Sequence, residues 1–299
     1  MRIGLMLPMA SGDVDRTLRF ARRAEELGFD GVFAFDHLFP PGGPPDRPAL
    51  EAYAVLAAVA ATTDRVRIGT LVSRASLRPA GMLAKQAATL DDVSGGRFVL
   101  GVGTGDALSR DEHRTFGLPY LDPDVRRDHL VETVRAVRSL FRGEPFPGGR
   151  HVPAIAGPLM PATVTPGGPP VWIGGRSEAA VRVAAREADG WNGWALDART
   201  FAARAELLRT EAGDREVEAT WAGALVVGRD GSEAAGLGQA RRDRGIRGDA
   251  VADDPGSAAR WLSDLAAAGA TWAILLAAGP ADRLELIGED VLPLLASAG

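Results

Sequence analysis

Cysteine is absent from the 299 residues and lysine is nearly absent, because Lys85 is the only one. Without cysteine the chain has no disulfides, no thiolate-ligated metal and no cysteine nucleophile. A single lysine leaves one candidate for Schiff-base chemistry, and it falls in MLAKQAATLDDV, a stretch that we expect to form a solvated helix. The four histidines show neither HxH nor HExxH spacing, so we expect no metal site.

Two further absences limit the class of protein. No apolar run approaches the roughly 20 residues of a membrane span, since the longest candidate is YAVLAAVAA at 53–61. The chain begins MRIGLMLP, which is typical of a strand rather than of a signal peptide. The net charge of −5, with no basic stripe, argues against nucleic-acid binding. We therefore expect a cytoplasmic enzyme that acts on a small molecule, with no nucleic acid and no membrane as partner.

What the sequence does contain is a recurring unit, in which a helical run rich in alanine and arginine is followed by a glycine and a short apolar strand. The unit occurs at 22–37, 87–103, 186–194 and 265–277. Its glycines are predicted to end helices in the left-handed conformation: Gly28, Gly95, Gly190 and Gly269. Further strands are predicted at 3–8, 66–73, 170–175 and 220–228, and helices at 14–27, 50–63, 79–93, 124–142, 177–188, 197–212, 232–244, 257–268 and 281–297.

The resulting pattern is eight short strands, apolar on both faces, that alternate with helices. Such strands are typical of a parallel sheet covered by helices, and eight of them predict a (β/α)₈ TIM barrel in one domain over residues 1–299. A doubly wound open sheet is the alternative, but it usually ends after five or six strands. Two stretches interrupt the pattern, at 143–169 and 228–256. We predict loop insertions there, either as lids over an active site or as plain surface loops.

The stretch GVGTGDALS, residues 101–109, follows the fourth strand and resembles a dinucleotide-binding loop. The dinucleotide fingerprint needs a third glycine where this chain has Asp106, so that interpretation fails. Glycine allows a backbone to approach a flat ligand closely, and Gly103 and Gly105 flank Thr104. A tight turn with a solvated aspartate is the alternative.

The second predicted strand ends FAFDHLF, which places Asp36 and His37 at the same end of the barrel, where barrel enzymes build their active sites. His37 is the only histidine at a predicted strand end. A lone histidine is most often structural, but at this position a catalytic role is equally plausible.

The fifth predicted strand ends WIGGRSEAA. Gly174, Gly175 and a helix that starts at Ser177 predict an anion site, with Arg176 beside it, although a plain glycine turn is the alternative. Together with the other two strand ends, this site suits a phosphorylated planar cofactor better than a metal or a covalent mechanism.

These segments resemble the luciferase-like monooxygenase superfamily, and within it the oxidoreductases that use the deazaflavin coenzyme F420. The resemblance is carried by ARRAEELGFDGVFAFDHLF, RVRIGTLVS, LAKQAATLDDVSGGRFVLGVGTGDA, PPVWIGGRSEAAVRVAAREADGWN and DDPGSAARWLSDLAAAGATWAIL. It implies the same barrel, with the cofactor at its C-terminal mouth. We expect a homodimer that moves a hydride between F420 and a small organic substrate.

The resemblance also implies roles for individual residues. Asp36 would meet the polar edge of the ring and His37 would lie beside the reacting carbon as the proton-transfer group. Leu71 and Val72 would be joined by a non-prolyl cis peptide bond that forms a bulge behind the ring. Further cofactor contacts would come from Thr104, Gly105, Ser109, Gly174, Gly175, Arg176 and Ser177.

The segment GTGDALS is similar to GTGEALN of the sugar-phosphate dehydrogenases in this group. Asp106 would stand where those enzymes place a glutamate acid/base, and Ser109 where they place an asparagine, but the shorter carboxylate reaches less far. Those enzymes also grip the substrate phosphate with lysines, which predicts another substrate for a chain whose only lysine lies elsewhere. Relatives that use FMN share the fold, so an FMN-dependent monooxygenase and a non-catalytic flavin-binding barrel are the alternatives.

Overall fold

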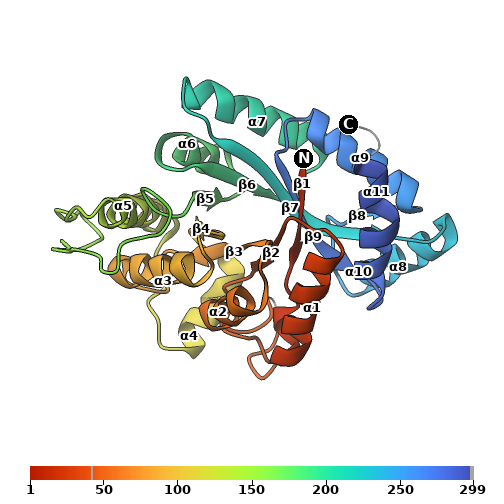
Figure 1. The fold of residues 1–299 in the computed structure, drawn as a ribbon, viewed down its shortest axis with the longest axis horizontal. Helices are drawn as coiled ribbons and strands as arrows, with labels where there is room; N and C mark the ends of the chain where they lie inside the picture. Colours follow the sequence, from red (N-terminus) through yellow and green to blue (C-terminus); the bar gives the residue numbers. More distant parts are fainter. Residues whose placement is uncertain (42, 297–299) are drawn as a thin grey trace.

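The computed structural model describes residues 1–41 and 43–296. Its strands are β1 (Arg2–Met6), β2 (Gly31–Ala34), β3 (Arg67–Arg74), β4 (Phe98–Gly103), β5 (Val171–Gly174), β6 (Gly190–Trp194), β7 (Glu218–Val227), β8 (Ala250–Ala252) and β9 (Trp272–Ala278). Strands β1 to β7 pair in chain order, and β9 pairs in parallel with both β7 and β1. The ring is therefore closed by eight parallel strands, which confirms the predicted (β/α)₈ barrel (Figure 1).

Helices surround this ring (Figure 1). They are η1 (Met9–Ser11), α1 (Val14–Glu26), α2 (Ala52–Thr62), α3 (Ala80–Val93), η2 (Ala107–Ser109), α4 (Arg110–Thr115), α5 (Pro123–Phe141), α6 (Glu178–Glu187), α7 (Ala198–Ala212), α8 (Gly231–Asp243), α9 (Pro255–Ala267), α10 (Arg283–Glu285), η3 (Leu286–Val291) and α11 (Leu292–Ala296). The helix expected at 281–297 consists of three consecutive pieces, of which η3 is a π-helix, and its last residue lies outside the described residues. The short helix α4 was not expected from the sequence.

Three of the four glycines predicted to end helices do so. Gly28, Gly95 and Gly269 have φ angles of 91°, 63° and 97°. For Gly190 the prediction was wrong, because this residue begins β6. A Cβ there would lie 2.5 Å from an indole carbon of Trp172, so the glycine makes room for a buried side chain rather than for a helix end.

The inside of the barrel is filled by aromatic rings from three strands. Phe33, Trp172 and Trp272 lie with ring centroids 5.7 to 5.9 Å apart. Their bulk is accommodated by glycines on neighbouring strands: a Cβ on Gly69 would come within 2.9 Å of the Phe33 ring, and one on Gly31 within 3.1 Å of Trp272. Large rings opposite glycines thus close the interior below the site.

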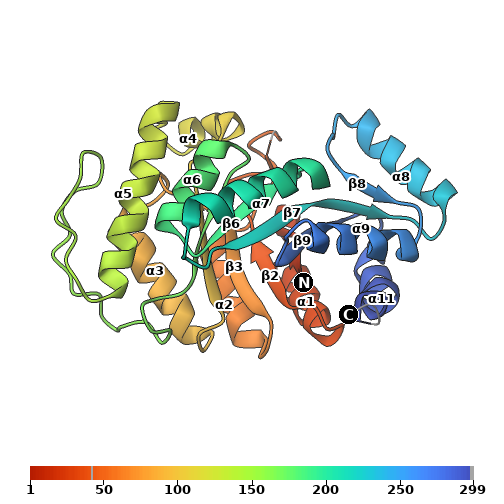
Figure 2. The same cartoon turned by 90° about the horizontal axis from the view of Figure 1, so that it is seen from above.

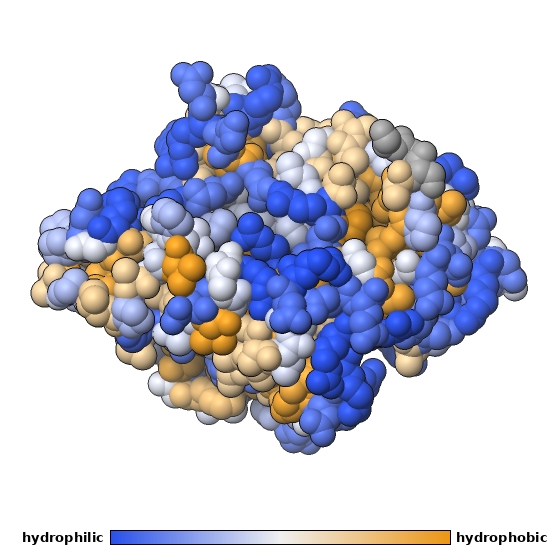
Figure 3. Space-filling model, in the orientation of Figure 1, coloured by the Kyte–Doolittle hydropathy of each residue, from blue (hydrophilic) through white to orange (hydrophobic). Residues whose placement is uncertain are grey.

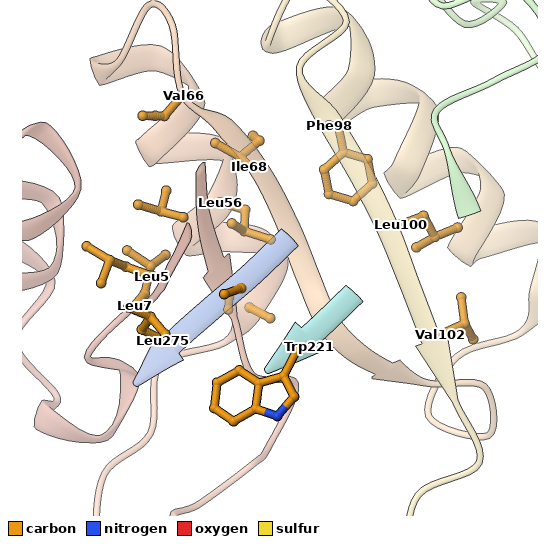
Figure 4. Packing of buried hydrophobic residues seen from close by; sticks show 14 of the residues in the cluster. Leu5, Leu7, Leu56, Val66, Ile68, Phe98, Leu100, Val102, Trp221 and Leu275 are labelled. Atoms are coloured by element: carbon orange, nitrogen blue, oxygen red, sulfur yellow. The ribbon is translucent and has the colours of Figure 1, made fainter. Parts of the chain in front are cut away.

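The outer faces of the strands pack against the helices. Figure 4 shows Leu5, Leu7 and Leu275 gathered near Leu56 of α2, with further apolar side chains of β3, β4 and β7 beside them. Alternate residues of each strand therefore face either the aromatic interior or this layer, as expected for strands buried on both faces.

The insertion at 143–169 contains no helix or strand, only a bridge between Phe146 and Ile155. The Glu132 carboxylate of α5 accepts hydrogen bonds from the amides of Arg150, His151 and Val152. The insertion lies outside α3 and α5, at one edge of the molecule (Figure 2). It is held against these helices and lines no part of the cavity described below, so the structure favours a plain surface segment over a lid.

The helix predicted at 232–244 is confirmed by α8, but the loop predicted over 228–256 also contains the short strand β8, which was not expected. Residues 225–227 of β7 extend beyond its pairing with β6, and β8 pairs with them in parallel. The unit lies on the opposite side of the barrel from the first insertion (Figure 2) and likewise lines no part of the cavity.

The face of the molecule in Figure 3 is largely hydrophilic, with separate apolar patches. Among the described residues, no helix combines the length and the apolar character needed to cross a membrane.

Candidate active site

A cavity of about 900 Å³ lies at the C-terminal ends of five consecutive strands, β2 to β6. Its walls include Phe35 and His37 after β2, Leu71, Val72 and Arg74 of β3, Thr104, Gly105, Asp106 and Ser109 after β4, Gly174, Gly175, Arg176 and Ser177 after β5, and Asn192 and Trp194 of β6. All the predicted site residues except Asp36 line it. Catalytic residues of barrel enzymes lie at this end.

The floor of the cavity is shaped by a bulge in β3. The peptide bond between Leu71 and Val72 is cis, as predicted, and the pairing of β3 with β4 shifts register between Thr70 and Ser73. The Val72 side chain lies over two glycines, because a Cβ on either Gly103 or Gly174 would come within 2.7 Å of its methyl groups.

These contacts explain why the end of β4 carries so little side chain. A Cβ on Gly101 would lie 2.2 Å from the Thr70 carbonyl oxygen. Gly101 and Gly103 are therefore required by the bulge of the neighbouring strand. These two glycines allow β4 to pack closely against β3, whether or not they also allow a ligand to approach.

The turn after β4 is a capped helix start. The Asp106 carboxylate accepts a hydrogen bond from the Ser109 amide at 3.2 Å, and the Ser109 hydroxyl donates to the Asp106 carbonyl oxygen at 2.6 Å. Gly105 precedes them with φ 71°. Ser109 is buried and its hydroxyl is engaged within the turn, whereas Asp106 is exposed on the cavity wall. No hydrogen bond joins Asp106 to His37 in the described structure.

The turn after β5 leads into the N-terminus of α6, where the Ser177 hydroxyl caps the Ala180 amide at 3.2 Å. The Gly175 amide is already used, because it donates to the Asn192 carbonyl oxygen at 3.0 Å. The donors that remain for an anion are the first amides of α6, which have no partner within the helix. Arg176 is exposed beside them.

Asp36 faces away from the cavity. Both of its carboxylate oxygens are bound by Arg78, which lies over the Tyr53 ring at 4.5 Å. The Tyr53 hydroxyl in turn contacts the Ser73 hydroxyl at 2.8 Å. A contact between the Asp36 side chain and a cofactor ring stays a prediction.

His37 is held by a residue that the sequence analysis did not find. Its Nδ1 lies 2.6 Å from Oε1 of Glu112, on α4, and the other Glu112 oxygen accepts hydrogen bonds from the Leu38 amide and from Arg74, each at 2.7 Å. Burial alone would raise the pKa of Glu112, but the hydrogen bonds from His37 and Leu38 and the charge of Arg74 lower it. The carboxylate is therefore ionised at neutral pH.

The aromatic wall was also missed. Phe35 lies edge-on to both His37 and Trp194, with ring centroids 6.0 and 5.5 Å apart. The alternation of side chains along a strand was the available signal, since Phe35 stands two residues before His37 and Trp194 ends the GWNGW strand. In the described parts of the chain no three histidine or carboxylate side chains are grouped as metal ligands would be.

Comparison with known proteins identifies the family to which this chain is similar. A family model for luciferase-like monooxygenases matches residues 1–286. An F420-dependent glucose-6-phosphate dehydrogenase of Microbacterium testaceum (strain StLB037) is 34% identical over 200 residues, which cover 64% of this chain and 56% of that protein. Another, from Nakamurella multipartita, is 37% identical over 173 residues, or 56% and 48% of the two chains. The chain spans about half the length of these curated relatives.

Solved structures share the fold. An F420-dependent secondary alcohol dehydrogenase in complex with an F420–acetone adduct superposes with a TM-score of 0.84 at 20% identity, covering 98% of both chains. A long-chain alkane monooxygenase superposes with a TM-score of 0.80 at 16% identity, covering 100% of this chain and 92% of the other. On the match over residues 1–286, the chain belongs to the luciferase-like monooxygenase family, as the resemblance of its segments predicts.

Proposed function

We propose that the chain is an oxidoreductase that binds coenzyme F420 at the C-terminal end of the barrel and acts on a small organic substrate. The observation that carries the proposal is that one cavity combines a fixed histidine, a glycine-lined bulge and the N-terminus of α6. Its volume of about 900 Å³ is typical of cofactor and small-molecule sites. The names of the relatives at 34% and 37% identity support F420 rather than FMN.

The residues present fit such a cofactor. The bulge at Val72 and the backbone at Thr104 and Gly105 offer a surface without large side chains for a flat ring. The first amides of α6, with Arg176 beside them, suit a phosphate. Nε and Nη1 of Arg74 are buried without a partner in the described structure, so the cavity wall carries a side chain with donors that a ligand's oxygen or nitrogen could satisfy.

When bound, the deazaflavin supplies a hydride donor or acceptor. The chain's own residues then have three tasks. Phe35 and Trp194 exclude water from one side of the cavity. The bulge holds the ring and the first amides of α6 hold the phosphate, while His37 exchanges a proton with the substrate. His37 suits this task because its side chain is 22% exposed at the cavity while its Nδ1 is anchored.

The substrate is proposed to be other than a sugar phosphate. The single lysine, Lys85, lies on α3, donates to the Met160 carbonyl oxygen and does not line the cavity. Asp106 is proposed to orient the site rather than to transfer a proton, because its carboxylate caps the turn after β4.

Titration of the apoprotein with F420 and with FMN tests the cofactor. We expect tighter binding of F420. Tighter binding of FMN would move the protein to the monooxygenases, and binding of either without turnover of any substrate would make it a non-catalytic barrel.

The variant His37→Asn tests the proton-transfer role. We expect unchanged cofactor affinity and thermal unfolding, with turnover lowered by about 10²- to 10⁴-fold, the usual contribution of a general acid or base. Near-normal turnover would eliminate this role. Asp106→Asn, prepared in parallel, should lower turnover far less.

The cytoplasmic homodimer expected from the sequence stays a prediction. Light scattering of the purified protein tests the dimer, and Met82 and Met160, which are exposed on α3 and on the neighbouring insertion, are the first side chains to replace by charged ones.

A further inference from the structure

Glu112 is buried in a place that its sequence context does not explain. It lies in RDEHRT, a charged six-residue helix, between the exposed Asp111 and the buried His113. Its side chain has no exposed surface. A carboxylate is rarely buried without partners, because desolvation disfavours its charge. Glu112 has three such partners, and they come from two other strand ends.

The partners keep the carboxylate charged. Arg74, only 4% exposed, supplies the compensating charge to Oε2, and the Leu38 amide donates to the same oxygen. The Arg74 guanidinium also donates to the Asp36 carbonyl oxygen at 3.2 Å, so its position is fixed by the end of β2. The pKa of Glu112 is lowered despite its burial.

An ionised carboxylate can only accept hydrogen bonds. The ring nitrogen at 2.6 Å from Glu112 must therefore be the donor, which assigns the proton of a neutral His37 to Nδ1. The other nitrogen, Nε2, is then left with a free lone pair on a ring that lines the cavity. The Phe35 ring, edge-on at 6.0 Å, limits rotation of the imidazole.

We propose that Glu112 is a positioning residue that holds His37 in the Nδ1–H tautomer, so that Nε2 accepts a proton from the substrate. The proposal rests on the proton-transfer role proposed for His37. Glu112 does not line the cavity and acts only through His37. Arg74 supports it by keeping the carboxylate ionised, because a protonated Glu112 could donate to Nδ1 and select the opposite tautomer.

The tautomer can be measured on the resting protein without substrate or cofactor. ¹⁵N-histidine NMR at pH 8 distinguishes a protonated from a bare ring nitrogen, and loss of one of the four signal sets in His37→Asn assigns His37. We expect Nδ1 protonated and Nε2 bare. A wild-type protein with the proton on Nε2 overturns the proposal, whatever the function proves to be.

The variant Glu112→Gln then tests whether the Glu112 carboxylate sets the tautomer of His37. We expect the single tautomer to be replaced by a mixture, and kcat to fall at least about tenfold, within the range of a lost general base, while the Kd for F420 changes less than twofold. The matched control is Asp111→Asn, which removes an exposed carboxylate from the same helix and should change neither the tautomer nor kcat. An unchanged His37 tautomer in Glu112→Gln overturns the positioning role.

Should Glu112→Gln fail to fold because Arg74 is left unpaired, the double variant Arg74→Gln/Glu112→Gln removes both charges, and its His37 tautomer alone is measured, because Arg74 lines the cavity. A changed tautomer with unchanged turnover would support the role of Glu112 and contradict that of His37, so the two proposals fail separately.

Discussion

Both terminal nitrogens of Arg78 bind the two carboxylate oxygens of Asp36, at 2.5 and 3.0 Å. Asp36, the residue directly before His37, is 3% exposed, and Arg78 is half-buried beside it. Burial alone would lower the pKa of Arg78, but the hydrogen bonds and the charge of Asp36 raise it above its ordinary value. The pair fixes the backbone from which the histidine projects.

Arg78→Met should therefore destabilise the protein strongly. Removal of one partner leaves a buried carboxylate unpaired, which typically costs about 3–5 kcal/mol. The matched control is Arg209→Met, which breaks the exposed pair with Glu206 and should cost no more than about 1 kcal/mol. Urea unfolding measures both, and equal losses in the two variants would contradict the prediction. The double variant Asp36→Asn/Arg78→Met should be more stable than Arg78→Met.

Gly103→Ala tests the packing of the bulge. The new Cβ would lie 2.7 Å from a Val72 methyl group, and overpacking of this kind typically costs about 1–3 kcal/mol. Val72→Ala should restore most of the loss, because it removes that methyl group. Gly101→Ala is the control, since its Cβ would meet the Thr70 carbonyl oxygen at 2.2 Å, which Val72→Ala cannot relieve. If Val72→Ala restored the stability of Gly101→Ala as fully as that of Gly103→Ala, the contacts named here would not be the cause of the two losses.

Gly175→Ala tests the proposed phosphate site. The added Cβ would lie 2.6 Å from the Ala180 Cβ, so the first turn of α6 must shift and its amides leave their positions. We expect weaker cofactor binding by calorimetry, with affinity regained when Ala180→Gly is added. Full affinity in the single variant would argue that these amides do not hold the cofactor.

Stability should fall as the pH is lowered from 7.5 to 5.5. Burial lowers the pKa of both His113 and His129 below the ordinary value of 6.5. In this window the unfolded chain binds more protons than the folded one, so stability is present above pH 6.5 and is lost as the pH falls toward the folded pKa values. Carboxylates with lowered pKa values, such as Glu112, act at lower pH.

His129→Gln should make the free energy of unfolding less dependent on pH in this window, because one of the two histidines with a lowered pKa is removed. Lys85→Gln, which removes a charged side chain other than a histidine, is the control. The unfolding free energy is measured at pH 7.5 and at pH 5.5. If the difference between the two values is the same in His129→Gln as in the wild type, His129 does not contribute to the pH dependence.

The barrel itself could be predicted from the sequence. The alternation of helical runs, glycines and apolar strands is a local signal, and Gly28, Gly95 and Gly269 follow it because a left-handed helix end needs only its own residue and its neighbours. Gly190 departs from it because the Trp172 indole, from another strand, occupies the space of its Cβ.

The site was predictable only in outline. Strand ends placed His37 and the glycine turns at one mouth, and family resemblance supplied the cis bond after Leu71. Only the tertiary structure decided what these residues contact. Glu112 and His37 are 75 positions apart, and nothing in either local sequence requires them to meet. They do so because barrel closure brings the ends of β2 and β4 to the same rim, where desolvation makes a buried carboxylate depend on donors from distant segments.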